Sequence, residues 1–185
     1  VRWLWQSLAN CRLCPRRCGV NRLAGELGYC QTGPLPEVAS WGPHFGEEDV
    51  LSGISGSGTV FFSGCNLRCL FCQNIDISRF SRGRQLPVSE LVDVFLDLQK
   101  EGCHNINLVS PTHQVAAIAV ALELACQQGL RIPVVYNSGG YDSVDTLRQI
   151  DGLIQIYLPD MKYADGPVAA RYSDAPDYPG INQAA

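Results

Sequence analysis

The spacing of hydrophobic and polar positions indicates alternating strands and helices from residue 59 onward. Short apolar runs bounded by turn residues predict buried strands, and longer segments with apolar residues three or four positions apart predict helices. The predicted strands cover residues 59–63, 105–110, 132–137 and 153–158. The predicted helices cover residues 89–102, 114–128 and 143–150. Strands separated by helices indicate a parallel α/β sheet.

The two longer predicted helices each have a recognisable end and one apolar face. Ser89 is the expected N-cap of the first helix, and Gly102 ends it. The second helix ends before Gly129, and its apolar residues stay in register as far as Cys126. We therefore expect Cys126 to be a buried apolar thiol and not a metal ligand.

Two segments lack a periodic pattern. Residues 31–58 are rich in glycine, proline and serine and are expected to form a long loop with little regular structure, and residues 172–180 are also loop-like. Long loops in compact domains are often functional. Because His44 lies near Glu47 and Glu48, it is a candidate acid-base group, with a structural or solvated histidine as the alternative.

The composition is that of one globular domain, since 185 residues of which 46% are hydrophobic can bury a core of ordinary size. No apolar run approaches the roughly 20 residues of a membrane span. Residues 1–10 lack the pattern of a signal peptide, so we expect a cytoplasmic protein without a membrane partner. The net charge of −4 gives no basic surface for nucleic acid. Nine cysteines in tight spacings favour a reducing compartment and metal binding over disulfides.

Three cysteines follow the first predicted strand with the spacing C-x3-C-x2-C, namely Cys65, Cys69 and Cys72. Thiolates are soft ligands that select iron-sulfur clusters and zinc over hard cations. A [4Fe-4S] cluster normally takes four thiolates, so a loop that supplies three leaves one iron open for chemistry. A zinc ion with an outside fourth ligand is the alternative, but structural zinc sites usually have four protein ligands.

This motif, with Phe71 before its last cysteine, resembles the signature of the radical S-adenosylmethionine (SAM) superfamily. Its context, from residue 63 through Gln73 and Asn74, resembles pyruvate formate-lyase activating enzyme and its relatives. The resemblance implies a partial (β/α) barrel and a catalytic [4Fe-4S] cluster on the three cysteines, with SAM chelating the open iron. In that superfamily one electron from the cluster cleaves SAM to a 5'-deoxyadenosyl radical, which abstracts hydrogen. It also implies an electron donor such as a flavodoxin or ferredoxin and, for an activating enzyme, a protein substrate.

Polar residues also follow the other predicted strands, where parallel α/β folds bind their ligands. Besides His113, the candidates for contact with SAM are Phe71, Ser110, Thr112, Asn137, Asp160 and Lys162. The best-known members of the resembled family carry a Gly-Gly-Glu segment after the second strand, where this chain has hydroxyls at 110 and 112. Asp160 and Lys162 resemble an acidic and basic pair that contacts SAM in activating enzymes, and a surface ion pair is the alternative.

The first 30 residues form a cysteine-rich head with the spacing C-x2-C-x3-C-x11-C, made by Cys11, Cys14, Cys18 and Cys30. Four soft ligands suit a zinc ion or a second iron-sulfur cluster, and spacing alone does not separate the two. Unligated buried thiols are a third interpretation. Residues 11–22 also resemble the head of the activating-enzyme-like proteins. We therefore divide the chain into a head and loop, 1–58, and a barrel domain, 59–185.

The barrel is expected to be incomplete, because the four predicted strands are fewer than the resembled family has. Its last strand would then be an exposed edge. The leading prediction for function is a radical SAM enzyme that cleaves SAM and abstracts hydrogen, an oxidoreductase that resembles pyruvate formate-lyase activating enzyme. Two alternatives are an iron-sulfur electron carrier or scaffold that does not cleave SAM, and a zinc-binding adaptor built on the head.

Overall fold

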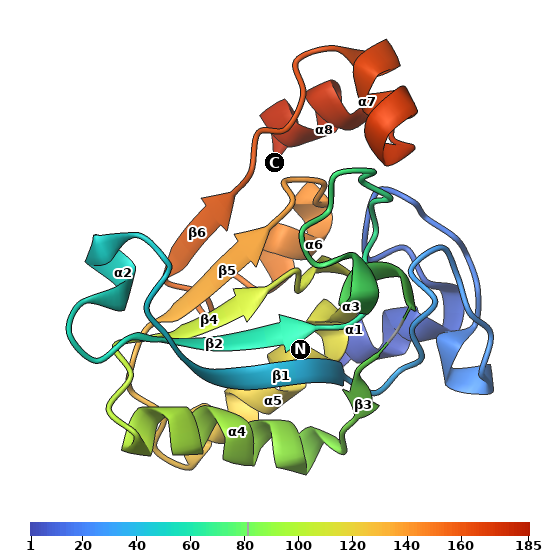
Figure 1. Ribbon diagram of the computed structural model, residues 1–185. Coiled ribbons are helices and arrows are strands. Elements are labelled where there is room, and N and C mark those ends of the chain that lie inside the picture. Colours follow the sequence, from blue (N-terminus) through green and yellow to red (C-terminus); the bar gives the residue numbers. More distant parts are fainter. Residues whose placement is uncertain (81) are drawn as a thin grey trace.

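The fold is built on a six-stranded sheet, seen in a computed structural model that describes residues 1–80 and 82–185 (Figure 1). The strands are β1 (Glu37–His44), β2 (Ser57–Phe62), β3 (Arg84–Gln85), β4 (Ile106–Val109), β5 (Val134–Ser138) and β6 (Ile156–Pro159). Their order across the sheet is β3-β1-β2-β4-β5-β6. β2, β4, β5 and β6 are parallel, whereas β1 is antiparallel to both of its neighbours. The predicted α/β class is therefore confirmed, with a mostly parallel sheet consistent with a partial (β/α) barrel.

The parallel half of the sheet follows the predicted alternation of strands and helices. The connecting helices are α4 (Val88–Lys100), α5 (Val115–Gln127) and α6 (Val144–Gln149). Every end of these strands and helices lies within three residues of its predicted position. β6 forms one edge of the sheet, as expected.

Helices α4 and α5 cover one face of the sheet, and the core lies between them and the strands (Figure 1). Leu91 and Phe95 of α4, and Ile118 and Leu122 of α5, are almost completely buried there. Burial of one such side chain stabilises the fold by roughly 1.5–3 kcal/mol. This apolar layer therefore fixes the sheet in place and leaves the ends of its strands free to carry polar residues.

The prediction that Cys126 is buried is wrong, because its thiol is exposed. The buried stripe of α5 passes from Leu122 to Ala125, three positions further along. Cys126 lies one residue, about 100° of helical rotation, beyond that stripe. The helical register therefore turns its thiol away from the core.

Residues 31–58 contain more regular structure than predicted, namely β1 and the short helix α2 (Asp49–Ser52). Gly42 and Pro43 in β1 argue against a strand inside a sheet. The register resolves this conflict, because β3 pairs only with Glu37 and Val38 and leaves the rest of β1 as an edge. Pro43 therefore needs no outward N–H. The sheet also runs across the expected domain boundary between residues 58 and 59.

The predicted loop at residues 172–180 is likewise wrong, because two helices, α7 (Gly166–Ser173) and α8 (Tyr178–Ala184), occupy most of it. Asp165 caps α7, since its side chain accepts a hydrogen bond from the Val168 amide at 2.9 Å. Pro179 lies in the first turn of α8, where a missing N–H costs nothing. Both helices lie beyond the carboxyl end of β6 (Figure 1).

The remaining helices are short. They are α1 (Arg2–Gln6), α3 (Ile75–Phe80) and the 3-10 turns at Ser7–Asn10, Arg22–Ala24 and Thr112–Gln114. Among the described residues, no helix has both the length and the apolar character needed to cross a membrane.

A buried arginine ties the amino-terminal segment to the sheet. Arg22 is 2% exposed, and its guanidinium donates hydrogen bonds to the carbonyl of His113 at 2.7 Å and to the Thr32 hydroxyl at 3.2 Å. It also donates to the carbonyl of Gly33. A buried charge is tolerated only where such partners replace water. The arginine therefore fixes residues 32–33 against the loop that follows β4.

The His113 side chain is buried beneath this arginine, and its Nε2 lies 2.7 Å from the carbonyl oxygen of Ser63. Because a carbonyl only accepts, Nε2 carries the proton of a neutral ring. Burial, helped by the charge of Arg22, lowers the pKa of His113 from 6.5 to about 4. His113 thus has a structural position behind the loop that follows β2.

We predict that stability falls when the pH is lowered from about 6.5 to about 4. In that interval His113 becomes protonated in the unfolded chain but stays neutral in the folded chain. This difference lowers the free energy of unfolding by about 3 kcal/mol in total. Urea unfolding at a series of pH values measures this slope. The variant His113→Gln should lose that part of the slope, while a change at the exposed His104 should keep it. An identical slope in wild type and His113→Gln would contradict the assignment.

Candidate functional site

The carboxyl ends of the parallel strands border one open cavity of about 660 Å³, a size suited to a small-molecule ligand. The structure brings together there every residue that the sequence nominated for the cluster and for SAM, apart from His113. They are Cys65, Cys69, Phe71, Cys72, Ser110, Thr112, Asn137, Asp160 and Lys162. The cavity also reaches His44 and Glu47, so the candidate acid-base histidine lies on the same wall, at the end of β1 and not on a loop.

Each thiol of the three-cysteine loop has a hydrogen-bonding partner. The Leu67 amide donates to Cys65 Sγ at 3.4 Å, and the Ser173 hydroxyl donates to Cys69 Sγ at 2.9 Å. Cys72 Sγ lies 3.3 Å from the Ser78 hydroxyl. Donors of this kind favour anionic sulfur, which is the form that binds metal.

Burial, together with the neighbouring thiols Cys69 and Cys72, raises the pKa of Cys65 to about 11. Without a cation this thiol is therefore protonated at neutral pH. A bound metal centre would replace the proton and supply the positive charge that three adjacent thiolates require. The donor set of this loop fits an iron-sulfur cluster in its chemistry.

A single metal ion would need its ligands grouped around one point. Among residues 1–80 and 82–185, no three side chains of His, Cys, Asp or Glu are grouped closely enough to hold one ion. Ligands of one zinc ion all lie within about 2.3 Å of the same point. A [4Fe-4S] cluster instead distributes its thiolates over separate iron atoms, so its ligands need not meet at one point.

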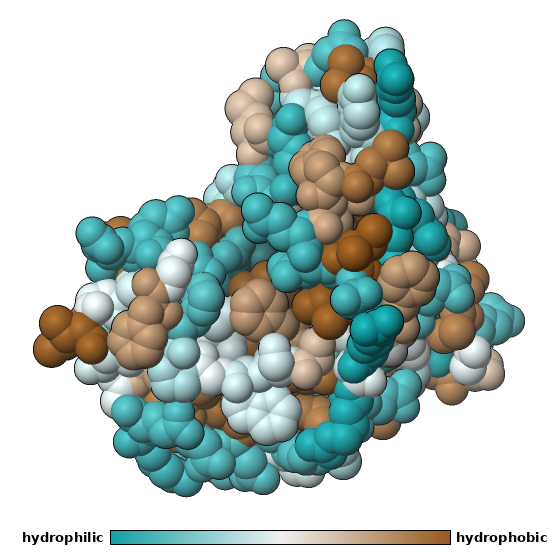
Figure 2. Space-filling model, viewed as in Figure 1, coloured by the Kyte–Doolittle hydropathy of each residue, from teal (hydrophilic) through white to brown (hydrophobic). Residues whose placement is uncertain are grey.

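The loop is attached to the carboxyl-terminal helix α7. The amides of Arg68 and Leu70 donate to the carbonyl oxygens of Ser173 at 3.2 Å and Tyr172 at 2.8 Å. The side chain of Phe71 remains 56% exposed and makes an edge contact with the Tyr163 ring, 6.2 Å between centroids. Figure 2 shows apolar surface in the region between the carboxyl-terminal helices and the sheet.

Ser110 has an unusual backbone conformation at the end of β4. Its φ angle of 57° lies in the left-handed region, which residues other than glycine rarely adopt. Its amide donates to the Asn137 carbonyl at 2.9 Å, so the ends of β4 and β5 are joined here. Strain of this kind is concentrated at functional sites, and here it directs two neighbouring strand ends into the cavity.

Asp142 supports the same region, although no pattern in the sequence points to it. Its buried carboxylate accepts hydrogen bonds from the hydroxyls of Thr112 at 2.6 Å, Ser138 at 2.6 Å and Tyr136 at 3.1 Å. Burial raises its pKa despite these three donors. The carboxylate therefore fixes Thr112 and Ser138, two residues of the cavity wall, from behind.

Asp160 and Lys162 form an ion pair at the end of β6. The side chain of Asp160 is 54% exposed and that of Lys162 is 23% exposed, so the pair contributes little to stability. The carbonyl of Asp160 and the amide of Lys162 both bond to the Tyr178 hydroxyl, at 2.9 and 3.0 Å. Their backbone is therefore held by α8 while their charges face the cavity.

The four cysteines of the head line a second, smaller cavity. Burial, together with the other three thiols, raises the pKa of Cys14 to about 12. Like the loop cysteines, they are not grouped closely enough to hold one ion. The structure thus brings these four residues together without assigning them a metal.

These features define an α/β protein with a ligand cavity at its strand ends and three thiols on the cavity wall. The chain belongs to the radical SAM superfamily, whose sequence profile matches residues 59–159. It is similar to the uncharacterized protein MJ0674 of Methanocaldococcus jannaschii, with 32% identity over 178 residues. That alignment covers 91% of this chain and 50% of the relative, so the chain spans about half the length of the protein it matches. Members of the superfamily typically bind a [4Fe-4S] cluster and SAM.

Replacement of Asp142 by asparagine tests its supporting role. The amide nitrogen cannot accept from the hydroxyls that face it, so we expect a loss of roughly 1–3 kcal/mol in the free energy of unfolding. Urea denaturation measures the change. Asp145→Asn, an exposed carboxylate on α6, is the matched control and should have almost no effect. Equal stability of the two variants would rule out this role for Asp142.

Proposed function

We propose that this chain carries the catalytic site of a radical SAM enzyme, with a [4Fe-4S] cluster on Cys65, Cys69 and Cys72. The observation that carries the proposal is the convergence of these cysteines with Asp160 and Lys162 on one cavity. When bound, SAM and the reduced cluster supply a 5'-deoxyadenosyl radical for hydrogen abstraction. The electron comes from a one-electron donor protein such as a flavodoxin or ferredoxin.

The polar groups of the cavity match the charged groups of SAM. The Lys162 ammonium donates to a carboxylate, and the Asp160 carboxylate accepts from an ammonium group. Ser110, Thr112 and Asn137 offer neutral donors and acceptors where the best-known members of the resembled family carry a glutamate. Two neutral hydroxyls would bind the amino group of SAM more weakly than a glutamate carboxylate does. Among these residues, Asp160 therefore supplies the main negative charge for that group.

The half-exposed ring of Phe71 has an apolar role in this proposal, beside the polar roles of the residues above. It lies beside the last cysteine and lines the cavity. An apolar ring next to a cluster excludes water, which strengthens electrostatic interactions inside the site and protects a reactive intermediate. By resemblance, the hydrogen donor would be a glycine of a protein substrate, as for glycyl-radical activating enzymes.

The proposed activity is tested by reconstituting the chain anaerobically with iron and sulfide, reducing it and adding SAM. We expect formation of 5'-deoxyadenosine, and we expect Cys69→Ala to reduce it to background because the cluster loses a ligand. Cys126→Ser, which alters an exposed thiol outside both cavities, should retain full product formation. If wild type binds an intact cluster yet forms no product, the electron-carrier or scaffold function is favoured instead.

The role of Lys162 is tested by its replacement with glutamine. Loss of a charge-assisted hydrogen bond of about 1.5–3 kcal/mol should weaken SAM binding roughly 10- to 100-fold. Anaerobic calorimetry of the reconstituted protein measures the dissociation constant. Lys100 provides a matched control, because it also forms an ion pair with a nearby aspartate, Asp97, but lies on the surface of α4. Lys100→Gln should leave the SAM affinity unchanged, and an unchanged affinity in Lys162→Gln would remove Lys162 from the binding site.

A further inference from the structure

A second group of thiols lies directly beside the three-cysteine loop. The cavity lined by Cys11, Cys14, Cys18 and Cys30 is also lined by Asn66. Asn66 lines the larger cavity as well, and it lies between Cys65 and Cys69 in the chain. One residue of the catalytic loop therefore forms part of the wall of both cavities.

The two buried head thiols have nitrogen donors directed at their sulfur atoms. The Arg22 guanidinium lies 3.9 Å from Cys11 Sγ. The backbone amide of Arg16 donates to the thiol of Cys14. A thiol that serves only as a small apolar side chain needs no such partners, whereas a metal-bound thiolate is stabilised by them.

The two more accessible thiols have partners of the same kind. The Tyr29 amide donates to Cys18 Sγ at 3.4 Å, and the Thr32 hydroxyl lies 3.1 Å from Cys30 Sγ. Gly28 packs so closely that a Cβ atom there would lie 3.0 Å from Cys18 Sγ. The backbone thus approaches this sulfur more closely than most residues with a Cβ atom would. Each of the four head thiols therefore has a hydrogen-bonding group beside its sulfur.

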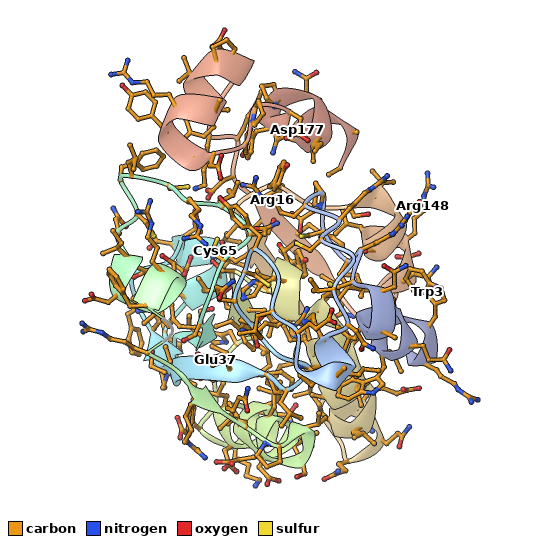
Figure 3. The ribbon with its side chains drawn as sticks, turned by 90° about the vertical axis from the view of Figure 1, so that its right-hand side faces the viewer. Trp3, Arg16, Glu37, Cys65, Arg148 and Asp177 are labelled. Carbon is orange, nitrogen blue, oxygen red and sulfur yellow. The ribbon has the colours of Figure 1, made fainter. Side chains whose placement is uncertain are left out.

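Arg16 connects this group of thiols to the catalytic loop. It lies between Cys14 and Cys18 in the chain, and its Nε donates to the carbonyl oxygen of Asn66 at 2.9 Å. Its Nη1 donates to the carbonyl of Asp174 at 2.5 Å, just after α7. Figure 3 shows Arg16 and Cys65 in neighbouring parts of the molecule. The position of the head turn therefore sets the position of the loop.

We propose that Cys11, Cys14, Cys18 and Cys30 bind a soft metal as a closed four-thiolate centre, and that this centre holds the catalytic loop through Arg16. Four protein ligands leave no position for a substrate, so the centre is structural where the three-cysteine site is open. The free space in the head cavity is small, about 10 Å³. The thiol side chains must therefore rotate around the incoming metal, and each releases its proton to solvent as it binds.

Metal counting in the anaerobically reconstituted full chain tests the site itself. A variant that lacks Cys65, Cys69 and Cys72 should still bind metal, and adding Cys14→Ala or Cys18→Ser to it should abolish that binding. Zinc without sulfide would identify a mononuclear centre, and iron with an equal amount of sulfide would identify a cluster. Either result supports the proposal. Cys126→Ser in the same background should change nothing.

Two results would overturn the metal site. One is the absence of stoichiometric metal in the variant without the three loop cysteines, provided that its circular dichroism matches that of wild type. The other is full metal retention after Cys14→Ala and Cys18→Ser. Because no SAM is present in these measurements, they remain valid even if the chain proves unable to cleave SAM.

The coupling to the catalytic loop is tested by the rate at which a chelator removes iron. Arg16→Lys loses the bond to Asn66 and should accelerate iron release from the loop cluster about tenfold, the lower end of the range for supporting residues around metals. Release from the variant without loop cysteines gives the head's own contribution, which is subtracted. Arg12→Lys alters an exposed arginine of the same segment and should release iron at the wild-type rate. Equal rates for Arg16→Lys and Arg12→Lys would show that the head does not hold the loop.

Discussion

Parallel pairing of β2, β4, β5 and β6 is the constraint on which the rest of this structure depends. In a parallel sheet all strands point the same way, so the loops that follow them meet at one edge. The cysteine loop, the Ser110 turn and the Asp160–Lys162 pair follow β2, β4 and β6, and Asn137 lies near the end of β5. Segments as far apart in sequence as residues 65 and 162 therefore line one cavity. The apolar layer of α4 and α5 holds the strands in register and makes this convergence possible.

Convergence of polar residues at one edge has an energetic cost, and buried hydrogen-bonding groups offset it. Asp142 satisfies three hydroxyls behind the cavity wall, and Arg22 satisfies carbonyl oxygens behind the cysteine loops. Each side chain is a buried charge, and its hydrogen-bonding partners replace the water that a buried ion loses. Neither side chain lines the larger cavity, although both touch residues next to it. Rigidity at the site thus comes from buried charge networks as well as from apolar packing.

Local patterns are enough to predict the parallel strands, their helices and the cavity residues, because each nominated residue lies near the end of a strand or in the loop after it. β1 was missed because Gly42 and Pro43 read as a loop, and only the short length of β3 makes that part of the strand an edge. Helix α8 was missed because Pro179 and Gly180 resemble a turn, although a first helical turn tolerates proline. Asp142 could not be found in the same way, since it joins Tyr136 and Ser138 of the preceding strand to Thr112, which lies 30 residues away in the chain. Its role depends on tertiary contacts that no periodicity records.

The two groups of cysteines differ in number and in the space around them, and the tasks proposed for them follow from that difference. The loop group offers three thiols to a cavity large enough for a ligand, so a metal centre there retains an exchangeable position. The head group offers four thiols to a cavity with almost no free space, so any centre there is saturated by the protein. An open site needs its ligands fixed from outside, because it lacks the fourth thiolate that would complete its own geometry. The bond from Arg16 to Asn66 is a contact through which the closed site can supply that restraint.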